Sequence, residues 1–208
     1  MERKNQILVN SFLIGISLIL SNCNGSIESK INSRTKIDLK KDTVSVKPDL
    51  IVNGLRLLDE TSLHNLTRKE VHIKEYIRAH PSVIFLNEEN TQYLIASQYE
   101  GDIANYFSLF ELGYLQDETS FDTIGIKTQI KDFVTESGLK LGISFNQLIA
   151  LKGNGYKEST EGEIKVISYT IEDPNNFLIK ETGLPLYFIQ VFLKNDTVFR
   201  IVFGFEYP

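Results

Sequence analysis

The order of apolar and polar positions repeats once along the chain. Residues 49–57 contain an acidic residue, an apolar β-prone run, polar residues and then Gly-Leu-Arg-Leu. Residues 132–141 follow the same order and end in Gly-Leu-Lys-Leu. This repetition predicts two copies of one structural unit, although chance similarity between short apolar runs is an alternative explanation.

A helix is predicted after each of these stretches. Residues 59–80 are polar and compatible with a helix, residues 67–70 have the spacing of a capping box, and Pro81 would end the helix. In the second half, residues 144–147 read Ser-x-x-Gln, apolar positions follow, and Gly153 is a typical helix stop.

Three β-strands are predicted after each helix, from runs rich in β-branched and aromatic residues. They cover residues 83–86, 91–99 and 105–115 in the first half, and residues 163–171, 186–194 and 198–207 in the second. The Asn195-Asp196 pair between two of these runs indicates a hairpin, because Asn and Asp tolerate positive φ. The last strand is expected to place Phe199, Ile201, Phe203 and Phe205 on one core face.

The expected fold class is therefore α+β, with two similar helix-plus-antiparallel-meander units in tandem. The first unit would span residues 49–118 and the second residues 119–208. One helix on a three-stranded sheet buries only one face, so the units would gain by packing together or by continuing one sheet.

The start of the chain has the pattern of a secretory signal peptide, predicted at residues 1–22. Arg3 and Lys4 precede an apolar run at residues 7–20, which is shorter than the roughly 20 residues needed to cross a bilayer. Residues 23–48 are predominantly polar and are expected to form a flexible tether, with a short strand at residues 43–46 as the alternative.

The sequence Leu20-Ser21-Asn22-Cys23 resembles the lipobox of bacterial lipoproteins, although Asn22 stands where that family usually has Gly, Ala or Ser. The resemblance implies cleavage before Cys23 and acylation at Cys23, and hence a membrane anchor in the cell envelope, at the outer membrane of a Gram-negative bacterium. Two or more acyl chains anchor stably where one does not. A buried core thiol and an uncleaved signal anchor are the other interpretations of this segment.

The charge of the chain argues against two classes of partner. The formal net charge is −5, so nucleic-acid binding, which requires a basic face, is not expected. A polybasic contact with anionic lipid is not expected either. Cys23 is the single cysteine, so an acylated chain has no thiol left for a disulfide and must be stabilised by its core.

No catalytic, cofactor or metal site is predicted. His64, His72 and His80 are spaced eight residues apart, whereas helical metal ligands use spacings of three or four. Gly153-Asn154-Gly155 follows a predicted helix, so it is expected to be a cap and not a phosphate loop. The acidic cluster at Glu88-Glu89 is expected to be a solvated turn, while carboxylates paired only by the fold remain possible.

Residues 138–153 have the sequence Gly-Leu-Lys-Leu-Gly-Ile-Ser-Phe-Asn-Gln-Leu-Ile-Ala-Leu-Lys-Gly. This sequence resembles the signature of the SmpA/OmlA-like (BamE-like) lipoprotein domain. In the first half, Leu58 stands where the second glycine of that signature would be. The resemblance implies a turn, a capped helix and a glycine stop, in a small domain of envelope lipoproteins that support outer-membrane assembly. A tandem version resembles the beta-lactamase inhibitory proteins, and the Lys-, Asn- and Ile-rich composition resembles lipoproteins of Bacteroidetes.

The functional expectation is a membrane-anchored envelope lipoprotein that acts as a non-enzymatic binding or assembly module with a protein partner. An inhibitor or immunity-type lipoprotein that masks a toxin or hydrolase is the alternative, and a concave face with tyrosine and acidic side chains would favour it. An enzyme is the third hypothesis, and a pocket that holds histidines beside carboxylates would favour that. The tyrosines considered for a sheet face, with core packing as the other interpretation, are Tyr93, Tyr99, Tyr106 and Tyr114.

Overall fold

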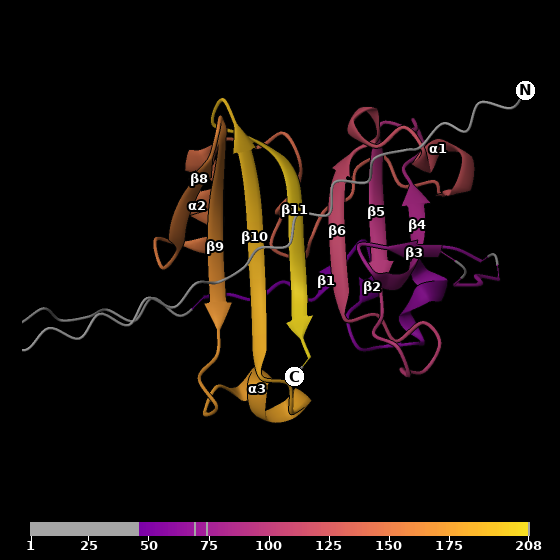
Figure 1. The fold of residues 1–208 in the computed structure, drawn as a ribbon, viewed down its shortest axis with the longest axis horizontal. Helices are drawn as coiled ribbons and strands as arrows, with labels where there is room; N and C mark the ends of the chain where they lie inside the picture. The colour runs from indigo at the N-terminus through magenta and orange to yellow at the C-terminus, as the bar shows by residue number, and fades with distance from the viewer. Residues whose placement is uncertain (1–45, 69, 74, 208) are drawn as a thin grey trace, which may run out of the picture. The chain divides into compact units, whose positions relative to one another are not determined.

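The computed structural model describes residues 46–207 except Lys69 and Lys74 (Figure 1). The predicted signal peptide, Cys23 and residues 23–45 of the predicted tether lie outside the described residues. The described residues belong to one compact unit.

Most of this unit is a single large sheet of nine strands, ordered β3-β4-β5-β6-β11-β10-β9-β8, with β7 paired to β4. All neighbouring pairs are antiparallel except β4 and β7. The strands are β3 (Glu75–Ile77), β4 (His80–Leu86), β5 (Gln92–Ser97), β6 (Leu109–Tyr114), β7 (Ile126–Lys127), β8 (Lys157–Glu161), β9 (Ile164–Ile171), β10 (Leu186–Lys194) and β11 (Thr197–Glu206).

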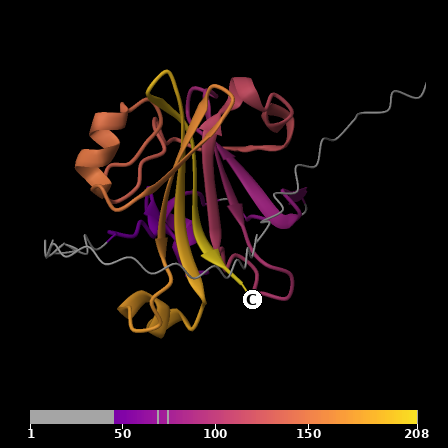
Figure 2. The same ribbon diagram turned by 60° about the vertical axis from the view of Figure 1, so that its left-hand side comes forward.

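Short elements surround the sheet. β1 (Ile51–Val52) pairs with β2 (Leu55–Arg56) as a separate hairpin. The α-helix α2 (Phe145–Lys152) lies on one side of the sheet, and α3 (Phe177–Thr182) lies at the ends of β9 and β10 (Figure 2). The remaining elements are η1 (Ser62–Asn65), η2 (Leu115–Asp117) and α1 (Phe121–Ile124).

The expected tandem of two helix-plus-meander units is wrong. Strands from both predicted units form one continuous sheet, and the described chain is mainly β-structure. The join is the antiparallel pair β6–β11, in register from Arg200 opposite Gly113 to Gly204 opposite Leu109. The backbone at Gly204 has φ of +153°, and a Cβ there would meet the Ser108 carbonyl oxygen and lie 2.8 Å from Leu109 Cα. A residue without a side chain is therefore what allows the two halves to approach.

The predicted helix at residues 59–80 is absent from the described part of that segment. It contains the single turn η1 and then the β3–β4 hairpin, in which Ile77 is opposite His80. The two linking residues, Arg78 and Ala79, both have positive φ (53° and 68°), as a tight two-residue hairpin turn requires. Pro81 lies inside β4 and does not end a helix.

The local predictions for the second half are confirmed. α2 begins at Ser144, whose hydroxyl accepts a hydrogen bond from the Gln147 N–H, while the Gln147 side chain accepts one from the Ser144 N–H. The helix ends at Gly153, with φ of +79°. The β10–β11 hairpin turns at Asn195 and Asp196, which have φ of 50° and 55°.

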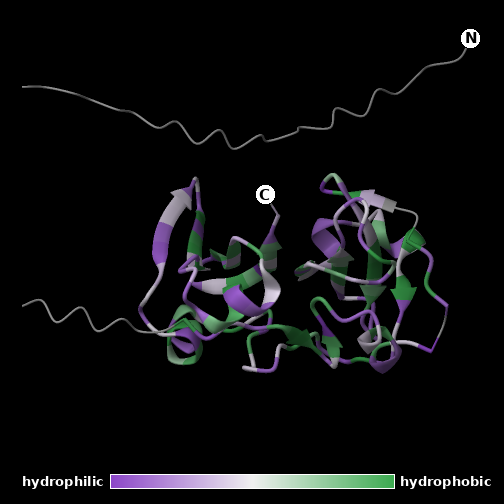
Figure 3. Cartoon of the chain, turned by 90° about the horizontal axis from the view of Figure 1, so that it is seen from below, coloured by the Kyte–Doolittle hydropathy of each residue, from purple (hydrophilic) through white to green (hydrophobic). Residues whose placement is uncertain are grey.

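The two sides of the sheet are buried to different extents. The side that we call the core face is covered across both halves of the sheet by one cluster, which includes Val52 of β1, Leu63 of η1 and Leu148 of α2. On the other side, a second cluster covers β4 and β5 only, with Leu115 and Phe121 packed on them. β8, at the left edge in Figures 1 and 3, is hydrophilic and fully exposed.

Candidate functional site

The three histidines do not form a joint site. The His64 ring contacts the Thr61 carbonyl in η1, His72 lies 3.7 Å from Glu70 at an exposed position, and the His80 ring packs edge-on against Tyr99 at 4.9 Å. Among the described residues, no group of three or more His, Cys, Asp and Glu side chains could hold a metal ion.

The tyrosines do not gather on an exposed sheet face. Tyr93 is buried against Phe121, with ring centroids 5.1 Å apart, and Tyr99 stacks on Tyr207 at 4.0 Å. The feature that would have favoured an inhibitor, a concave face with tyrosines and carboxylates, is therefore not found in the part of the chain that the structure describes.

Instead, one side of β9, β10 and β11 carries partly exposed side chains, although Val166 and Val202 on the same side are buried. Strand alternation places these residues opposite the buried residues of the core face, such as Ile189 and Val191. We call this surface the open face, and its members are Ser168, Thr170, Phe188, Gln190, Phe192, Phe199 and Arg200.

A β-bulge changes the expected position of Phe199. The pairing of β10 with β11 shifts between Phe192 and Leu193, so Phe199 is the extra residue of β11. Its ring lies 6.5 Å from that of Phe192, while Ile201 and Phe203 are buried in the core. The predicted single stripe is thus correct from Ile201 onward, and the bulge turns Phe199 to the open face.

Arg200 connects the open face to a buried carboxylate at the join between the two halves. Its guanidinium lies 5.0 Å from the Phe192 ring centroid and donates a 2.8 Å hydrogen bond to Glu111. Glu111 also accepts hydrogen bonds from Arg78 (3.1 Å) and from the Tyr93 hydroxyl (3.0 Å).

Electrostatics explain why this cluster leaves no free charge on the open face. Burial alone would raise the pKa of Glu111, but Arg200 and Arg78 outweigh burial and hold that pKa below its ordinary value. Glu111 is therefore ionised at neutral pH. Together with Glu118, which lies 2.6 Å from Arg78, it balances the charges of Arg200 and Arg78. Burial, together with Glu111, raises the pKa of Tyr93, so its hydroxyl remains protonated and donates.

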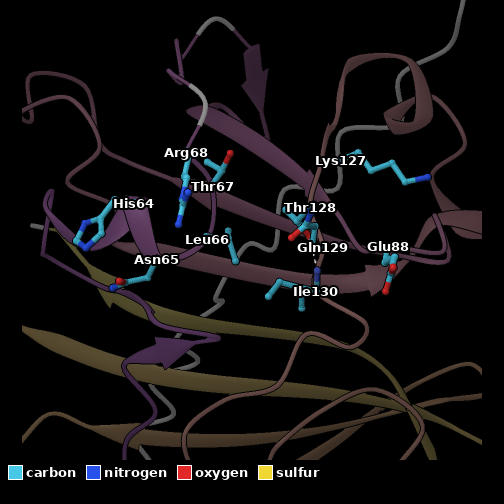
Figure 4. A pocket seen from close by; sticks show the side chains of 10 residues that line it. All are labelled: His64, Asn65, Leu66, Thr67, Arg68, Glu88, Lys127, Thr128, Gln129 and Ile130. Carbon is cyan, nitrogen blue, oxygen red and sulfur yellow. Dashed lines mark hydrogen bonds between the residues drawn. The ribbon is translucent and has the colours of Figure 1, made fainter.

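A groove lies at the edge of the sheet near β7. It is a half-open groove of about 900 Å³ between residues 64–68 and residues 127–130, with Glu88 at its border (Figure 4). His64 and Glu88 lie at opposite ends of the groove in Figure 4, so they do not form an acid–base pair. Leu66 and Thr128 are the buried residues of its lining.

A fully buried ion pair fixes the start of the described chain. Lys152 at the end of α2 forms an ion pair with Asp49, and both side chains are fully buried. Lys152 Nζ also donates to the Lys47 carbonyl at 3.1 Å, and the Tyr187 hydroxyl donates to the Asp49 carbonyl at 2.6 Å. These contacts hold the segment where the predicted tether ends against α2 and β10.

Membrane attachment was predicted through Cys23, which lies outside the described residues. No helix in the described part is long and apolar enough to cross a membrane. Comparison of the chain with protein-family models, curated proteins and solved structures gave no match. The open face and the groove are therefore interpreted from their own geometry.

Proposed function

We propose that the protein is a membrane-anchored envelope lipoprotein whose globular body is a non-enzymatic binding module, and that the open face docks a partner protein. The observation that carries this proposal is the partial exposure of Phe188 and Phe192 on one face of the sheet. Partly exposed aromatic side chains gathered on one sheet face are a feature of interaction sites.

The composition of the open face indicates the chemistry of the partner. Its centre has aromatic and neutral polar side chains, and the charge of Arg200 is balanced within the charge cluster at the join. Charged residues lie around it, including the Lys194–Glu163 pair at 3.4 Å and the exposed Glu206. An apolar centre with a polar rim is the anatomy of a protein interface, so the expected partner presents an uncharged, mainly apolar surface.

A lipid surface fits this arrangement less well. The chain carries a net charge of −5, and acidic side chains stand at the rim of the open face. Anionic lipid headgroups would be repelled, whereas basic clusters are what attract them. In the proposal, the acyl chains at Cys23 hold the membrane and the open face remains available to a protein.

Site-specific photo-crosslinking in intact cells tests the docking surface. A photoreactive amino acid at Gln190 should give one reproducible protein adduct, and the same probe at Glu158, exposed on β8, should not. Adding Phe188→Glu should abolish the adduct because it places a charge at the centre of the face. Phe177→Glu, a matched change at a side chain that is 76% exposed on α3, should leave the adduct intact.

Adducts with lipid alone, or a protein adduct that persists in the Phe188→Glu variant, would overturn the docking proposal. The anchor is tested separately by labelling cells with a radioactive fatty acid. The wild-type chain should incorporate the label and the Cys23→Ala variant should not, and equal incorporation would contradict the lipoprotein assignment.

A further inference from the structure

The groove near β7 has an unusual wall, because part of that wall is a sheet edge. β7 pairs in parallel with β4, with Ile126 opposite Phe85. The Thr128 N–H then donates to the Leu86 carbonyl at 2.9 Å, and the Glu88 N–H donates to the Ile130 carbonyl at 2.7 Å. Ile126 and Thr128 therefore face β4, whereas the Ile130 N–H donates to the Thr128 hydroxyl at 3.2 Å.

Backbone direction alternates along a strand, so Lys127, the last residue of β7, directs its N–H and C=O groups away from β4. The chain then bends at Gln129. Within the described part of the chain, no backbone or side-chain hydrogen bond satisfies the backbone N–H and C=O groups of Gln129. β3 occupies the same side of β4 but pairs only with His80, Pro81 and Ser82. The edge at residues 127–129 is consequently free.

The surroundings of this free edge distinguish it from the edge of the sheet at β8. At β8, every residue is exposed and three of the five are charged, which is a common protection against strand pairing. At residues 127–129, residues 64–68 form a facing wall, and the groove between the two walls has a volume of about 900 Å³ (Figure 4). That volume is within the range of ligand-binding clefts, roughly 300–1,000 Å³.

The groove also has apolar and charged positions suited to side-chain recognition. Leu66 is buried and Ile130 is partly buried between the walls. Arg68 and Lys127 are exposed cations on opposite walls, and Glu88 is the single carboxylate among the lining residues. The lining is therefore more positive than the chain as a whole, which has a net charge of −5.

We propose that this groove binds an extended peptide segment of another protein, which adds to the sheet as a further strand along Lys127 and Gln129. The backbone of the peptide exchanges hydrogen bonds with the free groups of this edge, as in strand-addition complexes. One apolar side chain of the peptide packs on Leu66 and Ile130, and an acidic side chain lies near Arg68 and Lys127. This site is separate from the open face and does not depend on the docking proposed there.

The test starts from a displayed library of random heptapeptides that is selected against the full chain purified in detergent. The selected peptides should be acidic, and one of them is synthesised for binding measurements. N-methylation of peptide residues that face the edge should weaken binding about tenfold per lost hydrogen bond. N-methylation of the intervening residues should have little effect, because their N–H groups point away from the edge.

Changes in the protein provide the matched comparison. Gln129→Pro removes the free N–H and should weaken binding by about tenfold, whereas Gln129→Ala keeps that N–H and should bind like the wild type. Arg68→Ala should weaken acidic peptides selectively. Phe188→Glu on the open face should not alter peptide binding, so failure of this site and failure of the open face are distinguished.

A peptide whose binding shows no alternation along its N-methyl series would overturn the proposal, and this arm is independent of whether Gln129→Pro folds. Failure to select any peptide that depends on Arg68 or Gln129 would overturn it as well. A third contradicting result is a dimer of the chain that Gln129→Pro dissociates and no peptide disrupts, since the edge would then pair with a second copy.

Discussion

The two halves of the sheet differ in how many hydrophobic clusters pack on them. In the half made by β4, β5 and β6, the core cluster packs on one side and a second cluster on the other, and all six residues of β5 are buried. In the half made by β9, β10 and β11, the second cluster has no member on these strands, and β10 alternates between buried and partly exposed residues. Phe188 and Phe192 occupy the partly exposed positions, where a strand facing only water would carry polar residues.

The two halves thus differ in whether their side chains mainly stabilise the fold or also offer a surface to a partner. In a strand that is buried on both sides, the side chain at every position contributes to the stability of the fold. In a strand with one open side, the buried positions stabilise the fold and the open positions are available to contact a partner. Substitutions in the two halves should therefore differ in their effects on stability and on binding.

The join between the two halves should be the most sensitive position. Gly204→Ala would force a Cβ into the Ser108 backbone at an unfavourable φ, so we expect a loss of about 3 kcal/mol or more in the free energy of unfolding. Urea denaturation measures this loss. Gly162→Ala is the control, because a Cβ there meets no atom within 4 Å and only the cost of its positive φ remains, about 1 kcal/mol. Equal losses in the two variants would contradict the close approach of β6 and β11.

Truncation of a phenylalanine should have different effects in the covered half and on the open face. Phe110→Ala removes a fully buried ring from β6 and should cost about 3–5 kcal/mol of stability. Phe188→Ala removes a partly exposed ring from β10 and should cost about 1 kcal/mol or less. Thermal and urea unfolding of both variants provide the measurement, and similar losses would mean that the open face is covered.

The charge cluster at the join should make the stability of the fold depend on pH through Glu111. The pKa of Glu111 is lowered in the folded chain, so its ionised form stabilises the fold above the pKa of the unfolded chain. That contribution is lost as pH falls from about 4.5, the ordinary value, through the lowered value. Glu111→Gln should therefore reduce stability at neutral pH and flatten the acid limb of a stability–pH curve. An unchanged acid limb would exclude Glu111 as its source.

Local sequence signals predicted the elements whose determinants are close together in the chain. Ser144, Gln147 and Gly153 predicted α2, and Asn195-Asp196 predicted the β10–β11 hairpin. These features succeed because a cap or a tight turn depends on the few residues that form it.

The prediction of a tandem arrangement was wrong because the residues that determine the observed sheet are far apart in the chain or are atypical of the turns they form. Arg78 and Ala79 form a positive-φ turn without the Asn or Gly that would signal it, so a hairpin was interpreted as a helix. Gly204 inside a strand was the available signal for a close backbone approach. The free edge at Gln129 was not visible in the sequence, because it depends on where β3 stops along β4.

Carbene footprinting of Phe188 and Phe192, read by mass spectrometry in the purified chain and in intact cells, tests the central claim most directly. We expect strong labelling of both rings in the purified chain and clear protection in cells, where the partner is present. Tyr76 and Ile103, which are 67% and 68% exposed, are references for reagent access. Protection in the purified chain, or equal labelling in both settings, would contradict an open face that serves to dock a partner.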